Sequence, residues 1–208
     1  INSGATPTNY SLRGTSFSLA PFSNRVHPPV GAVANAVITS DNPIQVTQYS
    51  QGTACDGTGN TDPEHIMIYP ETMWISDYTF SCSTTLTTTA AGVTLVVDDV
   101  AGARNSFLLD GVAVANTGWL FIGTSTYKYK RIPLVPGTHR VSNTALAPFS
   151  FYQFAVGDAE SYIVQGGASF TNCLVCTAQF RYTGTPYCIP PGGPATHPCP
   201  YGSPAGTF

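Results

Sequence analysis

The sequence predicts an all-β fold, namely an antiparallel two-sheet sandwich of the jelly-roll kind. Short segments in which polar and apolar residues alternate recur along the chain, and they are rich in β-branched and aromatic side chains. Gly, Pro, Asn or Asp bound these segments, and helical periodicity is almost absent. About a dozen short strands at this spacing are typical of a sandwich.

The alternation places the strands in order along the chain. The expected strands are residues 15–20, 35–40, 43–49, 77–82, 92–97, 105–109, 118–123, 150–156, 161–165 and 174–182. Asp110-Gly111 and Pro136-Gly137 each stand between two apolar runs, and these dipeptides are the clearest signals for tight turns.

Composition divides the chain into three parts. Residues 1–30 are polar and interrupted by Pro, which predicts an extended N-terminal arm, and residues 31–170 carry the continuous β pattern of the sandwich domain. Residues 171–208 hold four of the six cysteines in a Pro- and Gly-rich sequence. Because Pro lacks an amide donor and Gly adds conformational entropy, this last part can form neither a helix nor a central strand. We therefore expect an extended tail stapled by disulfides.

The six cysteines form an even set, which is compatible with three disulfides in an oxidising compartment. They are Cys55, Cys82, Cys173, Cys176, Cys188 and Cys199. In a strand, the Cα atoms of Cys173 and Cys176 would lie about 10 Å apart, beyond the limit of about 7 Å for a disulfide. We expect Cys55 to pair with Cys82. Cys173 and Cys176 then pair with the other two cysteines, in an order that stays open.

Charge is sparse along the chain. It has 8 Lys and Arg against 11 Asp and Glu, a net charge of −3 that gives too little positive field for nucleic acid. In a strand over residues 126–131 both lysines would share one face, and we expect this exposed lysine face to protect a sheet edge. No run reaches the roughly 20 apolar residues of a membrane span. The composition is typical of a protein that is extracellular or on the cell surface.

The strongest candidate for chemistry is the acidic stretch of residues 61–70, TDPEHIMIYP. Asp62, Glu64 and His65 lie within four positions there. In a strand, neighbouring side chains point to opposite faces, so Glu64 and His65 diverge. The stretch therefore predicts the start of a strand rather than a site.

The remaining titratable groups form no catalytic or metal-binding set either. Asp98 and Asp99 fall on opposite faces, and the spacing of a calcium loop is missing. The histidines are scattered, and no nucleophile motif or phosphate loop occurs. We therefore expect no catalytic residue, no cofactor and no metal, and a protein that is not an enzyme.

Several segments, taken in order, resemble the IgGFc-binding-like domain of secreted and surface proteins, especially its bacterial versions. They are VITSDNPIQVTQY, Cys55, DPEHIMIYPETMW, LDG, TYKYKRIPLVPGTHRV and PFSFYQFAVGDAESYIVQGG. The resemblance covers residues 33–170, and the Cys- and Pro-rich tail lies outside it. It implies an extracellular, non-enzymatic β domain named for binding antibody Fc, in which residues 61–70 are a structural strand entry.

The first functional hypothesis is a structural subunit that assembles with copies of itself into a fibre or surface layer. Residues 1–20 would add a strand to a neighbouring copy, with alternating apolar anchors at Tyr10, Leu12, Phe17 and Leu19. Docking of this arm on its own sheet is the alternative.

The second hypothesis is a monomeric binding or adhesion module for glycan, mucin or immunoglobulin. A third, a secreted hydrolase, has only scattered carboxylates in its favour. Asn9 begins the triplet Asn9-Tyr10-Ser11 and is a candidate for glycosylation.

Overall fold

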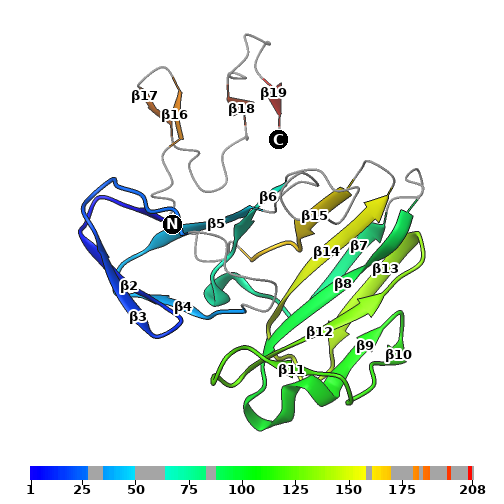
Figure 1. Cartoon of the computed structure of the whole chain (residues 1–208). Helices are drawn as coiled ribbons and strands as arrows, with labels where there is room; N and C mark the ends of the chain where they lie inside the picture. Colours follow the sequence, from blue (N-terminus) through cyan, green and yellow to red (C-terminus); the bar gives the residue numbers. More distant parts are fainter. Residues whose placement is uncertain are drawn as a thin grey trace. The chain divides into compact units, whose positions relative to one another are not determined.

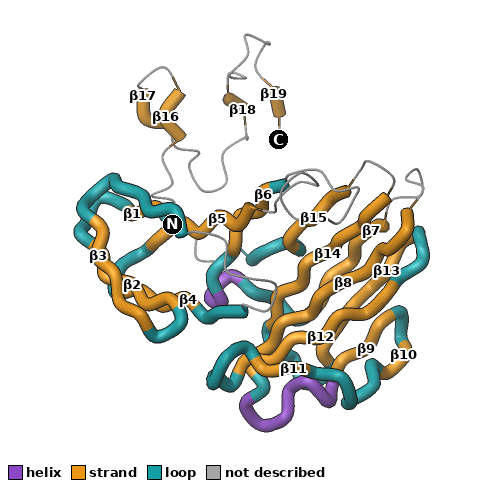
Figure 2. The backbone as a smooth tube through the Cα atoms, viewed as in Figure 1, coloured by secondary structure: helices purple, strands orange, loops and turns teal. Residues whose placement is uncertain are grey.

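The computed structural model of the chain describes residues 1–27, 35–49, 64–82, 88–157 and 161–169, and the strands β16 to β19 beyond them. The chain divides into two compact units, Ile1–Ala168 and Ser169–Phe208. The all-β class is confirmed, since the strands form several antiparallel sheets and none of these is closed. Figure 2 shows strands and loops through most of the first unit, with the short 3₁₀ helices η1 (Glu71–Met73) and η2 (Val100–Ser106).

Two sheets of the first unit, whose strands are labelled in Figure 1, share one hydrophobic core. One has four strands in the order β10-β9-β13-β7, and the other has five in the order β11-β12-β8-β14-β15. Their bounds are β7 (Asp77–Cys82), β8 (Thr88–Asp98), β9 (Phe107–Leu109), β10 (Val112–Ala113), β11 (Leu120–Phe121), β12 (Tyr127–Pro133), β13 (Gly137–Asn143), β14 (Phe149–Gly157) and β15 (Ser161–Gln165).

The core follows from strict alternation in the central strand β8. Val93, Leu95 and Val97 point inward and are 0% exposed, as expected when every second residue of a strand faces one side. Aromatic side chains from both sheets fill the space opposite them. The Phe149 ring, for example, lies 4.7 Å from the Phe107 ring between centroids, in an edge-on arrangement.

Residues 8–19 form a hairpin, which corrects the expectation of an extended arm. Strands β2 (Thr8–Leu12) and β3 (Thr15–Leu19) pair with each other, and β2 also pairs with β4 (Ile38–Ser40) of the same chain. The turn between β2 and β3 has positive φ at Arg13 and at Gly14, 54° and 75°. Two such residues make the tight turn whose twist matches a hairpin, so the chain doubles back here.

The apolar anchors expected on a donated strand are used within the chain. Tyr10 is 2% exposed and Leu19 is 6% exposed. The Phe17 ring stacks on the Tyr10 ring with centroids 5.2 Å apart, and Leu12 is half-buried at the end of β2. These contacts leave the hairpin without a free apolar row to offer to another copy.

A third sheet contains the described part of the acidic stretch. Its order is β1 (Asn2–Ser3), β5 (Ile44–Tyr49) and β6 (His65–Ile68). Ile66 is 6% exposed while the side chains on either side of it are exposed, so neighbouring positions do face opposite ways. His65 stacks on Tyr49, and Asp62 lies outside the described residues.

The lysines of residues 126–131 do not form an exposed edge face, which corrects that expectation. Strand β12 lies between β11 and β8, so it is not at an edge. Lys128 Nζ lies 2.8 Å from a carboxylate oxygen of Asp99 and 4.5 Å from the centre of the Phe121 ring. Lys130 donates hydrogen bonds to two carbonyls in residues 115–117, at 2.5 and 2.9 Å. Both ammonium groups therefore fix loops to the sheet.

The two predicted turns have different outcomes. Asp110-Gly111 joins β9 and β10 as a hairpin, in which Leu109 pairs with Val112. Pro136-Gly137 does not make a hairpin, because β12 and β13 belong to different sheets. There the short connection carries the chain from one sheet to the other.

A buried histidine ties the Asp110 turn to β13. His139 is 7% exposed; its Nδ1 lies 2.7 Å from a carboxylate oxygen of Asp110, and its Nε2 lies 2.8 Å from the carbonyl of Val135. Both partners only accept hydrogen bonds, so the ring donates from both nitrogens and is positively charged. Burial alone would lower the pKa of His139, but these hydrogen bonds and the Asp110 charge raise the pKa above 6.5.

This pair predicts a pH dependence of stability. Because the folded pKa of His139 is raised, its contribution is complete below 6.5 and is lost as pH rises through the raised value. Hydrogen bonds from His139 and from the Arg140 amide lower the Asp110 pKa, so its contribution is lost only as pH falls below 3.8. Urea unfolding between about pH 5 and about pH 9 should therefore show stability falling more steeply than in a His139→Gln variant. If the stability of both proteins changed with pH by the same amount, this prediction would be wrong.

In the second unit the structure describes two strand pairs. β16 (Phe180–Tyr182) pairs with β17 (Thr185–Tyr187), and β18 (Thr196–His197) pairs with β19 (Gly206–Thr207). The four tail cysteines and Cys55 lie outside the described residues. Cys82 is 1% exposed and forms no disulfide with another described residue, so the expected pairings remain predictions. Among the described residues, no helix has the length and apolar character needed to cross a lipid bilayer.

Candidate functional site

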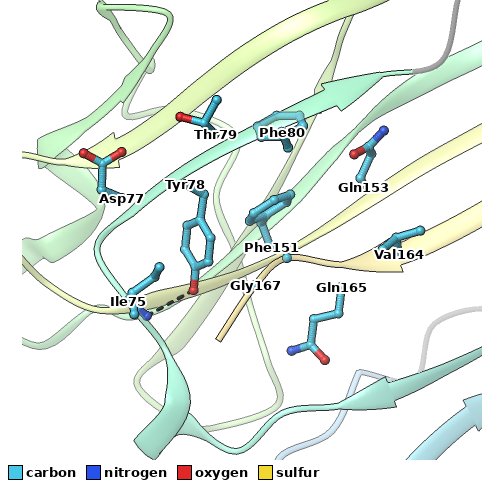
Figure 3. Close-up of a pocket in the computed structure, with 11 residues that line it drawn as sticks. Ile75, Asp77, Tyr78, Thr79, Phe80, Phe151, Gln153, Val164, Gln165 and Gly167 are labelled. Atoms are coloured by element: carbon cyan, nitrogen blue, oxygen red, sulfur yellow. Dashed lines mark hydrogen bonds between the residues drawn. The ribbon is translucent and has the colours of Figure 1, made fainter. Parts of the chain in front are cut away.

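A cavity of about 350 Å³ lies at the open side of the two main sheets, between strands β7 and β15 (Figure 3). β7 is the last strand of the four-stranded sheet, and β15 is the last strand of the five-stranded sheet. A cavity of this size is at the lower end of the range for ligand sites. The site therefore lies where both sheets end.

Three aromatic side chains form the floor of the cavity. The Phe80 and Phe151 ring centroids lie 4.8 Å apart with the rings tilted by 41°, and the Tyr78 ring meets Phe151 edge-on at 4.8 Å. The Tyr78 hydroxyl accepts a hydrogen bond from the Ile75 amide at 3.0 Å (Figure 3). It also donates one to the Phe149 carbonyl at 2.7 Å. Burial raises the pKa of this hydroxyl. Tyr78 is therefore a structural anchor rather than a proton donor.

Two glutamine side chains supply neutral polar groups. Gln153 Nε2 donates to the carbonyl of Ser81 at 2.8 Å, which links β14 to the edge of β7. Gln165 Oε1 accepts a hydrogen bond from the Tyr69 amide at 2.8 Å. Both amide groups are held in place, so the cavity has a fixed arrangement of polar atoms around its aromatic floor.

The rim carries one exposed apolar residue and one carboxylate. Val164 is 53% exposed on β15. Asp77 forms an ion pair with Arg140, and the hydrogen bond from Arg140 lowers the pKa of Asp77. Because this carboxylate is already neutralised, the rim has little net charge and offers no free base.

The lining of the cavity suits binding. It holds an aromatic floor, two neutral amides and a carboxylate, Asp77, that is paired with Arg140. No group of three His, Cys, Asp or Glu side chains that could hold a metal ion occurs in the part of the chain that the structure describes. The arrangement fits a neutral, partly apolar group.

A second hollow, of about 380 Å³, lies beside the N-terminal hairpin. The Arg25 guanidinium lies 4.7 Å above the Phe17 ring, and the Tyr10 hydroxyl lies 2.6 Å from His27 Nε2. Burial and then the Arg25 charge lower the pKa of His27. These side chains are engaged with one another, which makes this hollow the weaker candidate.

The candidate glycosylation site lies on the exposed side of β2. Asn9 Nδ2 donates to a carboxylate oxygen of Asp41 at 2.7 Å, and its Oδ1 accepts from Ser18 at 2.6 Å. A glycan would be attached to this same Nδ2 atom and would leave it one N–H to donate. Use of this site remains a prediction.

Sequence reasoning missed the whole cavity. It placed β7 and β15 with both ends correct, but nothing in either segment indicates that the two strands lie at the edges of facing sheets. The nearest local signal is Gly166-Gly167 directly after β15, because paired glycines often mark a close approach of the backbone to another group.

The comparisons with known proteins add a family. The family model described as IgGFc binding protein matches residues 11–157. This range starts inside β2 and ends with β14, so it includes β7 and leaves β15 just outside. It begins and ends earlier than the resemblance over residues 33–170. Neither the curated proteins nor the solved structures give a significant match.

Proposed function

Because the chain belongs to the family described as IgGFc binding protein, we propose that it is a non-enzymatic extracellular module that binds another extracellular protein. The match over residues 11–157, more than two thirds of the chain, is the observation that carries this proposal. The two sheets with their common core act as its scaffold, in the manner of a jelly-roll-like sandwich.

The cavity between β7 and β15 supports a binding role and is our candidate contact site. Fixed amides over an aromatic floor can hold a ligand without chemistry. The Fc region of immunoglobulin G is the first ligand to test, because the family description names it. Glycan and mucin remain the next candidates.

Self-assembly into a fibre has less support than binding. Such a fibre would use residues 1–20 as a strand added to a neighbouring copy, whereas Tyr10 and Leu19 of this segment are buried within their own chain. The family match likewise favours a binding module.

Binding to an immobilised Fc fragment tests the proposal. We expect saturable binding of the full chain to Fc, and none to the Fab fragment of the same antibody, which has related domains and serves as the control. Surface plasmon resonance at several protein concentrations measures this. A chain that binds neither fragment, or binds both equally, would contradict Fc recognition.

A further inference from the structure

Strand β7 has one edge that no described strand covers, since the sheet order ends there. On its other edge β7 pairs with β13, and there Thr79 lies opposite Arg140. The Arg140 carbonyl accepts a hydrogen bond from the Asp110 amide, and the Arg140 amide donates to the Asp110 carboxylate, both at 2.8 Å. In an antiparallel pair, two opposite residues that form no backbone hydrogen bonds with each other direct their N–H and C=O groups away from the partner strand. The Thr79 N–H and C=O therefore face the open side.

A second contact gives the same orientation. The Ser81 carbonyl accepts the hydrogen bond from the Gln153 side chain, so it too faces away from β13. Backbone groups two residues apart on a strand point the same way. Thr79 thus lies in an outward-facing row with Ser81, and Thr79 is itself exposed.

The open stretch of this edge is short and directly adjoins the cavity. At one end Ile75 bridges to Phe149 of the other sheet, and at the other end Gln153 holds Ser81. Between them Thr79 borders the cavity above the aromatic floor. The opposite wall at Gly167 has no side chain, and a Cβ there would meet nothing within 4 Å.

This edge also lacks the usual protection against pairing. Exposed edges are normally blocked by lysine, proline or an unpaired charge. β7 reads DYTFSC, with neither lysine nor proline, and its one charge, Asp77, is neutralised by Arg140. An edge of this kind can accept a further strand.

We propose that β7 binds a short extended segment of the partner polypeptide as an added strand. The proposal rests on the proposed function and specifies its partner. The segment hydrogen-bonds to Thr79 N–H and C=O, and one of its apolar side chains enters the cavity over Phe80 and Phe151. A peptide backbone supplies the alternating acceptor and donor that this edge needs, and the pocket selects the side chain. The small net charge at the rim favours an uncharged segment.

The test starts from a library of displayed ten-residue peptides, from which binders of the full wild-type chain are selected. The selected peptides are then measured on two variants. Thr79→Pro removes the outward amide, and an edge strand tolerates Pro where its N–H faces solvent. Thr79→Ala removes only the side chain. Selected peptides should bind wild type and Thr79→Ala equally and bind Thr79→Pro about tenfold more weakly, as expected for one lost hydrogen bond. Peptides that bind Thr79→Pro as well as wild type, or a library without enriched binders, would overturn the proposal.

Amide hydrogen exchange by NMR on the wild-type chain keeps the test valid if Thr79→Pro fails to fold. The Thr79 amide should become protected when a selected peptide binds, and unchanged exchange would overturn strand addition. Fc binding with an unprotected Thr79 amide would keep the proposed function and reject this inference. Peptide binding at β7 without Fc binding would keep this inference and reject Fc recognition.

Discussion

Replacing Phe149 with Ala should lower the free energy of unfolding by about 3–5 kcal/mol, the usual cost of removing a large buried aromatic side chain. Phe149 is 0% exposed, and its ring meets those of Tyr78 and Phe107 at 5.0 and 4.7 Å between centroids. Because Tyr78 and Phe107 belong to the facing sheet, the substitution removes contacts that hold the two sheets together.

Phe121→Ala is the matched control for this substitution. Phe121 is 61% exposed on the short strand β11 and its ring contacts the Lys128 ammonium, so loss of this side chain should cost no more than about 1 kcal/mol. Urea unfolding followed by circular dichroism gives both values. Equal losses in the two variants would show that the core does not have the composition described above.

Gly166→Ala should destabilise the protein by about 1–3 kcal/mol, the typical cost of overpacking. A Cβ on Gly166 would lie 2.1 Å from Cε1 of Phe151, and Phe151 is 2% exposed with little room to move. The ring would be displaced from the floor of the cavity, so ligand binding should weaken together with stability.

Gly167→Ala provides the comparison for Gly166, since a Cβ at position 167 meets nothing within 4 Å. The free energy of unfolding of this variant should lie within about 0.5 kcal/mol of the wild-type value. Thermal unfolding of the two variants side by side measures the difference. Equal stability of the two variants would show that Gly166 does not pack closely on Phe151.

Local patterns in the sequence were sufficient for the fold class and for several strands, although β13 (Gly137–Asn143) is not among the expected ones. The alternation of residues 77–82 and 161–165 predicts β7 and β15 with their observed ends. The hairpin at the N-terminus was missed because Arg13-Gly14 is not among the common turn dipeptides, although both residues adopt positive φ. Tertiary packing thus determined a turn that local sequence signals did not indicate.

The candidate site depends on contacts between residues far apart in the chain. Gln153 bonds to Ser81 across 72 positions, and His139 meets Asp110 only because β13 pairs with β9. Such contacts follow from which sheets face each other and in which register. Hydrophobic periodicity reports the face of a strand and not its neighbours, so the cavity could not be found from sequence alone.

The claim that the partner binds at the opening between β7 and β15 is tested most directly by two matched substitutions. Val164→Arg places a charge at the rim, and Val112→Arg makes the same change on β10, at the opposite end of the four-stranded sheet from β7. The two valines are 53% and 70% exposed, so both variants should fold. In the Fc binding assay we expect Val164→Arg to bind at least about tenfold more weakly and Val112→Arg to bind like wild type. Equal affinities for the two variants would contradict a binding site at this opening.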